Sequence, residues 1–332
     1  MLLFPDALLL LFAALVADAL IGDPDVLWRR WPHPVVLIGR LIGFLDKALN
    51  KDVFSQGRRK ISGAGALVLL VAAGFGAGYA IEHGARLLPY GQVLTVAVAA
   101  VLLAQKSLYQ HIAAVRDGLQ NDGLAGGRRA VAMIVGRDPQ ALDEAGVSRA
   151  AIESCAENFS DGIVAPAFWF AVLGLPGLIA YKAVNTADSM IGHKTDRHRA
   201  FGWAAARFDD LINLPASRLS GLLIALAAPL AGGSPGKAFR TIRADAGKHR
   251  SPNAGWPEAA MAGALNIALA GPRAYPGYTV DDPFLNANGR KSADARDISH
   301  ALNLLKGSCL LLAIFVLLLA AAITALNGTA VI

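Results

Sequence analysis

The run ISGAGALVLLVAAGFGAGYAI at residues 61–81 decides the class of fold. It carries no charged residue, and about twenty such residues are what a helix needs to cross the hydrocarbon core of a bilayer. Gly74 and Gly78 are four residues apart, so they share one face of this helix and let a second helix approach closely. The run therefore predicts a transmembrane helix that packs tightly against a neighbour.

The rest of the chain has the composition of a polytopic membrane protein. Hydrophobic residues make up 55% of the 332 residues, charged residues only 17%, and the mean hydropathy is +0.45. Further apolar runs predict three more clear spans, at residues 2–21, 93–108 and 308–326. The first of these has no basic leader and no cleavage site, so we interpret it as an uncleaved anchor.

Two other apolar segments do not fit a simple crossing. Residues 163–181 are interrupted by Pro166 and Pro176, and residues 219–231 are short for a span. Broken helices at membrane depth are stable only where protein or water satisfies their backbone, and binding sites of membrane proteins are often built there. We therefore expect an all-α fold, one membrane domain over residues 1–332, with broken or re-entrant helices, helical cytoplasmic loops and four or six crossings.

The charge pattern orients this domain and excludes some functions. There are 31 Lys and Arg against 25 Asp and Glu, a net charge of +6, and eight of the basic residues fall within residues 22–60. The positive-inside rule places that segment in the cytoplasm. Basic loops facing anionic lipid explain the excess, and no basic-aromatic module for nucleic acid is present. Cys155 and Cys309 are too few and too far apart for a disulfide framework or a zinc site.

The stretch ESCAENFSDGIVAPAFWF at residues 153–170 concentrates acids among apolar residues. If it is helical, Glu153, Glu157 and Asp161 follow one another at intervals of four residues and share one face. Like charges in such a row repel one another unless a cation neutralises them, and a divalent ion or phosphate-bound Mg²⁺ is the obvious cation. A solvated surface is the competing interpretation, but the scarcity of charge elsewhere favours a functional site.

Polar pairs at helical spacing recur further along the chain. Each pair places its two side chains on one helix face, three or four residues apart. The pairs are Asn185 with Asp188, Asp209 with Asn213, and Asp245 with His249.

The residues from Glu153 to Pro166 resemble the ESxAENxxDGxxxP signature of the CobD/CbiB family of cobalamin biosynthesis. Four further blocks agree with that family, in order and over essentially the whole chain. They are GDP and HPV at residues 22–24 and 33–35, KAVNTADSMIG at 182–192, ARFDDLINLPASRL at 206–219, and DAGKHRSPNAGWPEAAMAGAL at 245–265. No single block is specific, whereas the set of five is.

The resemblance implies a membrane-bound adenosylcobinamide-phosphate synthase. Enzymes of this family join adenosylcobyric acid to aminopropanol or its O-phosphate through an amide at the ring D propionate. ATP and Mg²⁺ are the implied energy source and cofactor. A multi-pass protein of the bacterial inner membrane is implied, with the lipid bilayer and other corrinoid-pathway enzymes as its partners.

Amide formation demands particular residue types, because a carboxylate must be activated, by phosphorylation for example, before an amine can attack it. As acid-base candidates we select Glu157, Asp161, Asp209, Asp210 and His249. As metal ligands we select Glu153, Glu157, Asp161 and Asp188. As substrate or phosphate contacts we select Asn158, Lys182, Asn185, Lys194, Arg207, Asn213 and Asn253.

Two other functions compete with a ligase. An ion-coupled transporter also uses broken helices and intramembrane acids, but the chain shows no inverted repeat and its polar residues gather in long loop segments. A noncatalytic membrane sensor or regulator would not need acids, amides and bases at this density. The formation of an amide product with consumption of ATP discriminates the ligase from both.

Overall fold

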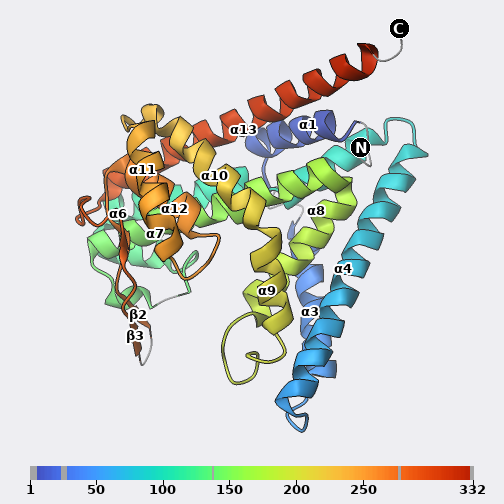
Figure 1. The fold of residues 1–332 in the computed structure, drawn as a ribbon, viewed down its shortest axis with the longest axis horizontal. Coiled ribbons are helices and arrows are strands. Elements are labelled where there is room, and N and C mark those ends of the chain that lie inside the picture. The colour runs from blue at the N-terminus through green and yellow to red at the C-terminus, as the bar shows by residue number, and fades with distance from the viewer. Residues whose placement is uncertain (1–5, 24–27, 137, 276–277, 330–332) are drawn as a thin grey trace. The chain divides into compact units, whose positions relative to one another are not determined.

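The computed structural model describes residues 6–23, 28–136, 138–275 and 278–329, and it is almost entirely helical (Figure 1). The all-α fold class predicted from the sequence is confirmed. The chain groups into two compact units, each assembled from separate segments. The first unit comprises Met1–Ala104, Ala165–Asn213 and Val316–Ile332, and the second comprises Gln105–Val164 and Leu214–Phe315.

The first unit is built around two long helices. Its helices are α1 (Ala7–Leu20), α3 (Pro34–Leu49), α4 (Gln56–Arg86), α5 (Gln92–Leu102), α8 (Ala165–Ile191) and α9 (Trp203–Ile212). A hydrophobic core joins α3, α4, α8 and α9, with Ile42, Leu70, Ile191 and Phe201 among its buried side chains. This core packs against the end of α8 and the beginning of α9, through Ala187 and Ile191 of α8 and Ala205 of α9.

Helices α4 and α8 touch through the glycines predicted for that purpose. A Cβ atom at Gly74 would lie 3.1 Å from the Cα of Ala180, and one at Gly78 would lie 2.6 Å from the backbone nitrogen of Pro176. Only glycine lets the two backbones come so close. Figure 1 shows α4 running beside the second half of α8. The predicted close packing is confirmed.

Helix α8 is broken, as its prolines indicated. Gly174 has φ 68° and ψ −155°, which is a conformation that favours glycine, and Pro176 follows inside the helix. Figure 1 shows the resulting change of direction. The break exposes the backbone N–H of Leu175, which donates a 2.9 Å hydrogen bond to the buried carboxylate of Glu82 on α4. The irregular backbone is thus satisfied by protein rather than by lipid.

The second unit packs helices around a small-residue core. Its longer helices are α6 (Gln105–Val131), α7 (Glu144–Phe159), α10 (Leu214–Ala227), α11 (Pro235–Asp245) and α12 (Gly255–Leu265), and α13 (Ala295–Thr329) begins in it. Short helical turns are η1 (Pro139–Ala141), η2 (Ser160–Val164), η3 (Ala228–Ala231) and η4 (Ala246–Lys248). Its only described strands form two antiparallel pairs, β1 (Leu269–Ala270) with β4 (Phe284–Leu285), and β2 (Arg273–Tyr275) with β3 (Tyr278–Val280).

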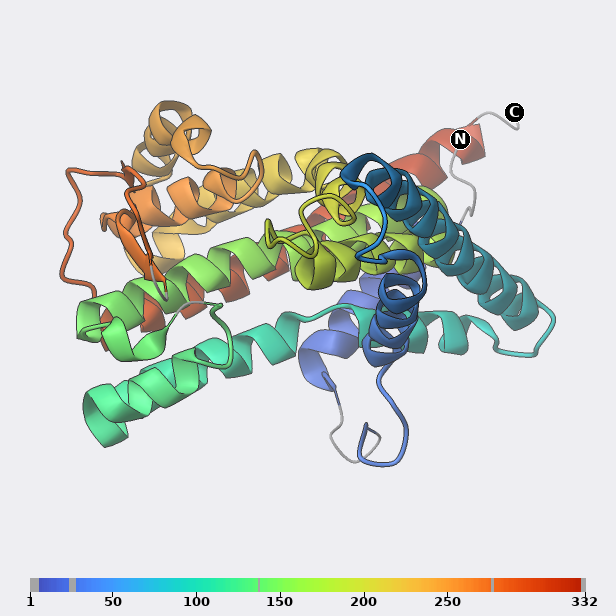
Figure 2. The same ribbon diagram turned by 90° about the horizontal axis from the view of Figure 1, so that it is seen from below.

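Helix α6 reverses at a glycine with the same backbone conformation as Gly174. Gly123 has φ 62° and ψ −153°, and the chain beyond it returns along the first arm (Figure 2). A Cβ at Gly118 would lie 2.8 Å from the carbonyl oxygen of Gly126, so the two arms are in backbone contact. An ion pair of 2.6 Å between Arg129 and Asp122 closes the end of this hairpin.

Five stretches of helix in the described residues are long and apolar enough to cross a membrane. They are Gln56–Arg86, Gln92–Val131, Glu144–Ile191, Leu214–Ala231 and Ala295–Leu326, and α1 is a shorter apolar helix. The spans predicted at residues 61–81 and 308–326 lie inside α4 and α13. The span predicted at 93–108 is instead divided, because Leu103 is extended (φ −85°, ψ 161°) and ends α5.

Candidate functional site

Three aspartates gather at the ends of α8 and α9, in the first unit. Asp188 lies in the last turn of α8, and Asp209 and Asp210 lie near the end of α9. Each of these three carboxylates lies within electrostatic range of at least one other. The intervening loop turns back on itself so tightly that a Cβ at Gly202 would overlap the carbonyl of Ile191. We call Asp188, Asp209 and Asp210 the aspartate cluster.

Two amides hold the central carboxylate of this cluster. Asn213 Nδ2 donates to Asp209 Oδ2 at 2.9 Å, and Asn185 Nδ2 lies 3.4 Å from Asp209 Oδ1. The hydroxyl of Tyr181 donates to Asn213 Oδ1 at 2.9 Å, which fixes the orientation of that amide. Asp209 and Asn213 are buried, with 7% and 1% of their surface exposed. The network therefore orients the Asp209 carboxylate, and its hydrogen-bond donors Asn185, Asn213 and Tyr181 are all neutral.

The pKa of Asp209 is raised to about 7, chiefly by burial and also by the negative charge of Asp188, while the hydrogen bonds from Asn185 and Asn213 oppose the rise. Burial also raises the pKa of Asp210, and the charges of Arg207 and Lys194 oppose that effect. The guanidinium of Arg207 lies 3.4 Å from Asp210. A carboxylate whose pKa is near neutrality can take up and release a proton under working conditions, as a general base must.

Asp188 owes its position to a missing side chain. A Cβ at Gly192 would overlap Asp188 Oδ1, and the Gly192 N–H donates to the Asp188 carbonyl at 2.7 Å as the helix ends. The carboxylate therefore folds over the backbone of Gly192.

The acid-rich motif of the second unit is helical through Phe159, as expected, but its members face different surroundings. Glu153 is buried and accepts a 2.9 Å hydrogen bond from the backbone N–H of Ala270, whereas Glu157 is exposed. Asp161 lies in η2, a π-helical turn that interrupts the regular four-residue spacing. The helix expected for this motif is confirmed through Phe159, and the regular spacing does not extend to Asp161. Turns of this kind are frequent at functional sites.

Asn253 is embedded in a second polar network of this unit. Its Oδ1 accepts hydrogen bonds from Ser217 Oγ at 3.1 Å and from Arg218 Nη1 at 3.0 Å. The guanidinium of Arg218 also lies over the ring of Trp256, 4.6 Å from its centroid. Asn253 is 5% exposed. Its amide thus orients Arg218 from a buried position.

His249 faces a glutamate that sequence analysis did not select. The backbone N–H of Ser251 donates to His249 Nδ1 at 3.1 Å, which leaves Nε2 directed at Glu258 Oε1, 3.6 Å away. Glu258 is 2% exposed. The available signal was a lone acid in the apolar run GWPEAAMAGAL. Tyr181 was missed as well, because only the folded chain places it against Asn213.

The predicted site residues therefore fall into two sets, one in each unit. The first set consists of Lys182, Asn185, Asp188, Lys194, Arg207, Asp209, Asp210 and Asn213. The second consists of Glu153, Glu157, Asn158, Asp161, His249 and Asn253. In the first set the structure brings together the aspartate cluster, its two asparagines, Arg207 and Lys194.

The proposed metal ligands do not form a closed protein cage. Among the described residues there is no group of three or more His, Cys, Asp or Glu side chains arranged to hold a metal ion. Glu153, Glu157 and Asp161 belong to one unit and Asp188 to the other. Mg²⁺ that enters with a nucleotide keeps several waters and needs only one or two carboxylates, so exposed Glu157 and half-buried Asp161 suit such an ion. The buried Glu153, bonded to Ala270, suits it less.

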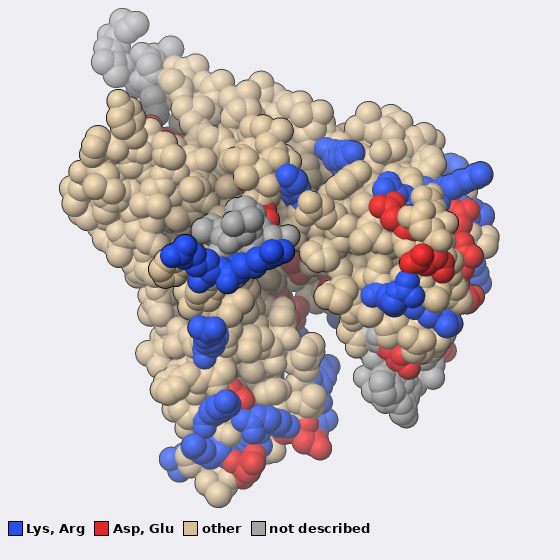
Figure 3. Space-filling model, turned by 180° about the vertical axis from the view of Figure 1, so that it is seen from behind, with Lys and Arg blue, Asp and Glu red and all other residues tan. Residues whose placement is uncertain are grey.

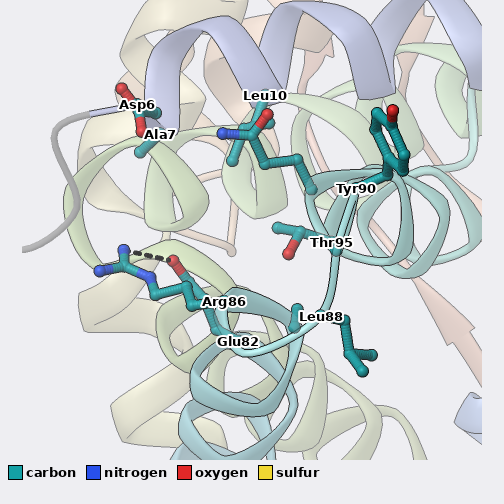
Figure 4. Close-up of a pocket in the computed structure, with 11 residues that line it drawn as sticks. Asp6, Ala7, Leu10, Glu82, Arg86, Leu88, Tyr90 and Thr95 are labelled. Carbon is teal, nitrogen blue, oxygen red and sulfur yellow. Dashed lines mark hydrogen bonds and ion pairs between the residues drawn. The ribbon is translucent and has the colours of Figure 1, made fainter.

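One cavity of the first unit is separate from these residues. It has a volume of about 340 Å³ and lies where α4 ends, between the beginnings of α1 and α5. Figure 4 shows the paired side chains of Glu82 and Arg86 on one wall, with Asp6, Tyr90 and Thr95 around them. None of the site residues predicted from the sequence lines it.

The family described as CobD/Cbib protein matches this chain over residues 11–305. A Cobalamin biosynthesis protein CobD from a Sinorhizobium species is 54% identical over 94% of this chain and 98% of its own length. Proteins of the same name from Brucella suis and Rhodobacter capsulatus are 54% and 49% identical, over 89% and 83% of this chain and 91% and 86% of their own lengths. No solved structure matches. These similarities extend over both units, and the chain belongs to the CobD/CbiB family of cobalamin biosynthesis proteins.

Proposed function

We propose that this protein is the ligase that attaches aminopropanol, or its O-phosphate, to the ring D propionate of adenosylcobyric acid. The family and the names of its relatives support a role in cobalamin biosynthesis. The observation that supports amide ligation in particular is Asp209, a buried carboxylate held by two amides, with its pKa raised to about 7. Amide ligation needs a base of this kind, and a pure scaffold or sensor does not.

The reaction requires two displacements. In the first, a propionate oxygen attacks the terminal phosphorus of ATP, which gives an acyl phosphate and releases ADP. In the second, the neutral amine attacks the acyl carbon, the C–N bond forms, and inorganic phosphate leaves with the original propionate oxygen. One proton must leave the ammonium before attack and another must leave the nitrogen afterwards. When bound, Mg²⁺ would neutralise charge on the phosphate oxygens.

The residues of the aspartate cluster suit the second displacement. Asp209 accepts the proton of the amine, and Asp188 and Asp210 attract the ammonium group to it. Lys194 and Arg207, beside Asp210, suit the phosphate or the substrate carboxylate. Asn213 is too buried to touch substrate, so we assign it to positioning Asp209, and Asn253 to positioning Arg218.

The remaining predicted residues keep contact roles in this proposal. The exposed Glu157 and half-buried Asp161 would hold Mg²⁺ with the nucleotide. Asn158, Lys182 and Asn185 would contact the amide-rich substrate, and His249, with Glu258 behind it, is the rival base to Asp209. The protein is a multi-pass membrane protein of the bacterial cell membrane, so this chemistry takes place at the membrane surface.

The deciding experiment is a reaction with purified components. The full-length protein in detergent receives adenosylcobyric acid, aminopropanol or aminopropanol O-phosphate, and MgATP, and mass spectrometry follows the amide product while ADP is measured in parallel. We expect one amide per ADP and no product without ATP. Asp188→Asn should lower turnover, and a Mg²⁺ titration shows whether the defect is in metal affinity. Asp122→Asn, which changes an exposed acid of α6, is the matched control.

Absence of the amide with every amine, from protein that is folded and membrane-inserted, contradicts the proposal. Uptake of a corrinoid or an ion into liposomes without product would point to a carrier. Glu82 of α4, a buried acid beside the break of α8, does not favour a carrier, because its carboxylate already accepts a hydrogen bond from the N–H of Leu175.

A further inference from the structure

A second cavity of the first unit has a cationic lining. It has a volume of about 640 Å³, within the range of small-ligand sites, and lies between the first turns of α4 and the loop that leads into α9. Three basic side chains line it, Arg59, Lys60 and Arg199, against one acid, Asp196, so the lining carries a net charge of 3 − 1 = +2. We call it the basic pocket.

Arg59 is built into the wall of this pocket. It is only 6% exposed, and its Nε donates to Asn50 Oδ1 at 2.7 Å while Nη2 donates to the carbonyl oxygen of Arg197. Asn50 is held in turn by Asp46, 2.7 Å from its Nδ2. Among the residues that the structure describes, no carboxylate lies within ion-pair distance of Arg59. A buried guanidinium that protein acids do not neutralise favours an anionic ligand.

The other two cations of the lining, Lys60 and Arg199, are exposed. Lys60 lies over the ring of Trp203, with Nζ 3.6 Å from the centroid. Arg199 is exposed, and no carboxylate of the described residues pairs with it. In the same loop it is Arg197 that pairs with an acid, Asp46 at 2.7 Å, and Arg197 is not among the residues that line the pocket. The pocket thus keeps its positive charge available.

The surroundings concentrate this charge at one end of the unit. Figure 3 shows Lys and Arg side chains, with some acids, gathered where α3 ends and α4 begins, below a large area without charges. The loop is held against α4, because a Cβ at Gly63 would overlap the backbone of Phe201. The same helix that begins at Trp203 carries Asp209 six residues later, about 9 Å along its axis.

We propose that the basic pocket binds the phosphate group of a soluble phosphate ester, either the nucleotide or the phosphorylated amino alcohol. The identity of the ester rests on the proposed function, while the phosphate chemistry rests on the pocket alone. A phosphate carries up to two negative charges, and guanidinium and ammonium groups bind its oxygens through charge-assisted hydrogen bonds, so one buried arginine and two exposed cations match it. The pocket and the proposed base share one helix, because Trp203 of the lining begins α9 and Asp209 lies near its end.

The test measures binding rather than turnover. The full chain, in uncharged detergent without lipid, is titrated with a non-hydrolysable ATP analogue, with aminopropanol O-phosphate and with aminopropanol, and affinities come from calorimetry. Lys60→Gln and Arg199→Gln should each weaken binding of at least one phosphate ester about tenfold, as the loss of a charge-assisted hydrogen bond does. Lys60→Arg should bind nearly as the wild type. Aminopropanol should not respond to these changes.

The matched control is Arg58→Gln, which removes the same charge from the same turn of α4. Arg58 is exposed, lies over the ring of Phe54 and does not line the pocket, so affinity should change less than twofold. Equal losses in Arg58→Gln, or unchanged affinity in both pocket variants, overturn the inference. A parallel titration of the same variants with vesicles that contain phosphatidylglycerol tests for a lipid headgroup site, and a loss of affinity seen only with these vesicles overturns the inference too. The two proposals can fail separately. If the wild-type protein makes no amide, but Arg199→Gln still weakens phosphate binding, the proposed function is refuted and the phosphate site is supported.

Discussion

The carboxylate of Glu82 accepts a 2.9 Å hydrogen bond from the backbone N–H of Leu175, ninety-three residues away along the chain. Glu82 is 3% exposed, and its other oxygen faces Arg86 at 3.5 Å. An acid inside an apolar helix is usually suspected of transport or catalysis. Here it replaces the helix carbonyl that Leu175 loses at the break after Gly174.

This contact predicts a difference between two substitutions of Glu82. Glu82→Gln keeps an oxygen acceptor for Leu175, so the thermal midpoint in detergent should stay close to that of the wild type. Glu82→Ala leaves a buried N–H without its acceptor and should cost about 1–3 kcal/mol of unfolding free energy. Equal midpoints for the two variants would show that the carboxylate does not support the break.

The glycine contact between α4 and α8 gives a matched pair of substitutions. Gly78→Ala places a methyl group 2.6 Å from Pro176 and should destabilise the protein by about 1–3 kcal/mol. Gly76→Ala, two residues earlier, meets nothing within 4 Å and should stabilise the helix by up to about 1 kcal/mol. Thermal unfolding in detergent measures both. The expectation fails if the two variants shift the midpoint in the same direction.

Asp209 predicts a specific dependence of stability on pH. Because its pKa is raised from 3.8 to about 7, the folded protein holds a proton between these values that the unfolded chain has released. This contribution to stability is present at the acidic end of the window and is lost as pH rises through about 7. Asp209→Asn should therefore flatten the change in thermal midpoint between about pH 5 and about pH 8.

The same residue predicts the pH profile of ligation. If Asp209 is the base, turnover should rise through about pH 7 as it ionises, and Asp209→Asn should remove the activity. Asp210→Asn is the comparison, since Asp210 is less buried and pairs with Arg207. A profile that keeps its shape in Asp209→Asn would transfer the role to another group, with His249 first.

Two glutamates of one motif should respond differently to substitution. Glu157 is exposed on α7, so Glu157→Gln should abolish turnover while expression, membrane insertion and thermal midpoint stay near normal. Glu153→Ala should lower stability by about 1–3 kcal/mol, because it removes the acceptor of the Ala270 N–H. Wild-type turnover in Glu157→Gln would rule out its proposed role.

The direction of α4 predicts the topology of the first unit. Its 31 residues span about 46 Å, more than the hydrocarbon core, so its two ends lie on opposite sides of the membrane. Arg58, Arg59 and Lys60 at its beginning favour the cytoplasm. Reporter fusions after Lys194 should therefore report a cytoplasmic site and fusions after Leu88 an external one. The reverse result would place Lys194 outside the cell, where cytosolic ATP cannot reach it, and would contradict the proposed site.

Local patterns predicted much of the architecture. The uncharged run at residues 61–81 and the spacing of Gly74 and Gly78 determine a helix and its packing face through the residues themselves. Pro176 marks a break because it removes a donor and clashes with the preceding turn. The break at Leu103 was not predictable in the same way, since neither proline nor glycine stands there.

The site was only partly accessible from the sequence. Acids and amides at helical spacing identified Asp188, Asp209 and Asn213 as candidate site residues. The separate role of each residue depends on its burial and on hydrogen-bond partners from other helices, as the bond from Tyr181 to Asn213 shows. Arg59 gave no signal among thirty other basic residues, because only folding buries it beside Asn50.

Gly192 limits which substitutions this part of the site can accept during evolution. Its hydrogen atom leaves the space that the Asp188 carboxylate occupies, so no larger residue can be inherited there while Asp188 stays in place. The same Cβ would also lie 2.6 Å from the backbone carbonyl oxygen of residue 188, and this contact does not depend on the aspartate side chain. Glycine should therefore be retained at position 192 even in descendants that lose the aspartate.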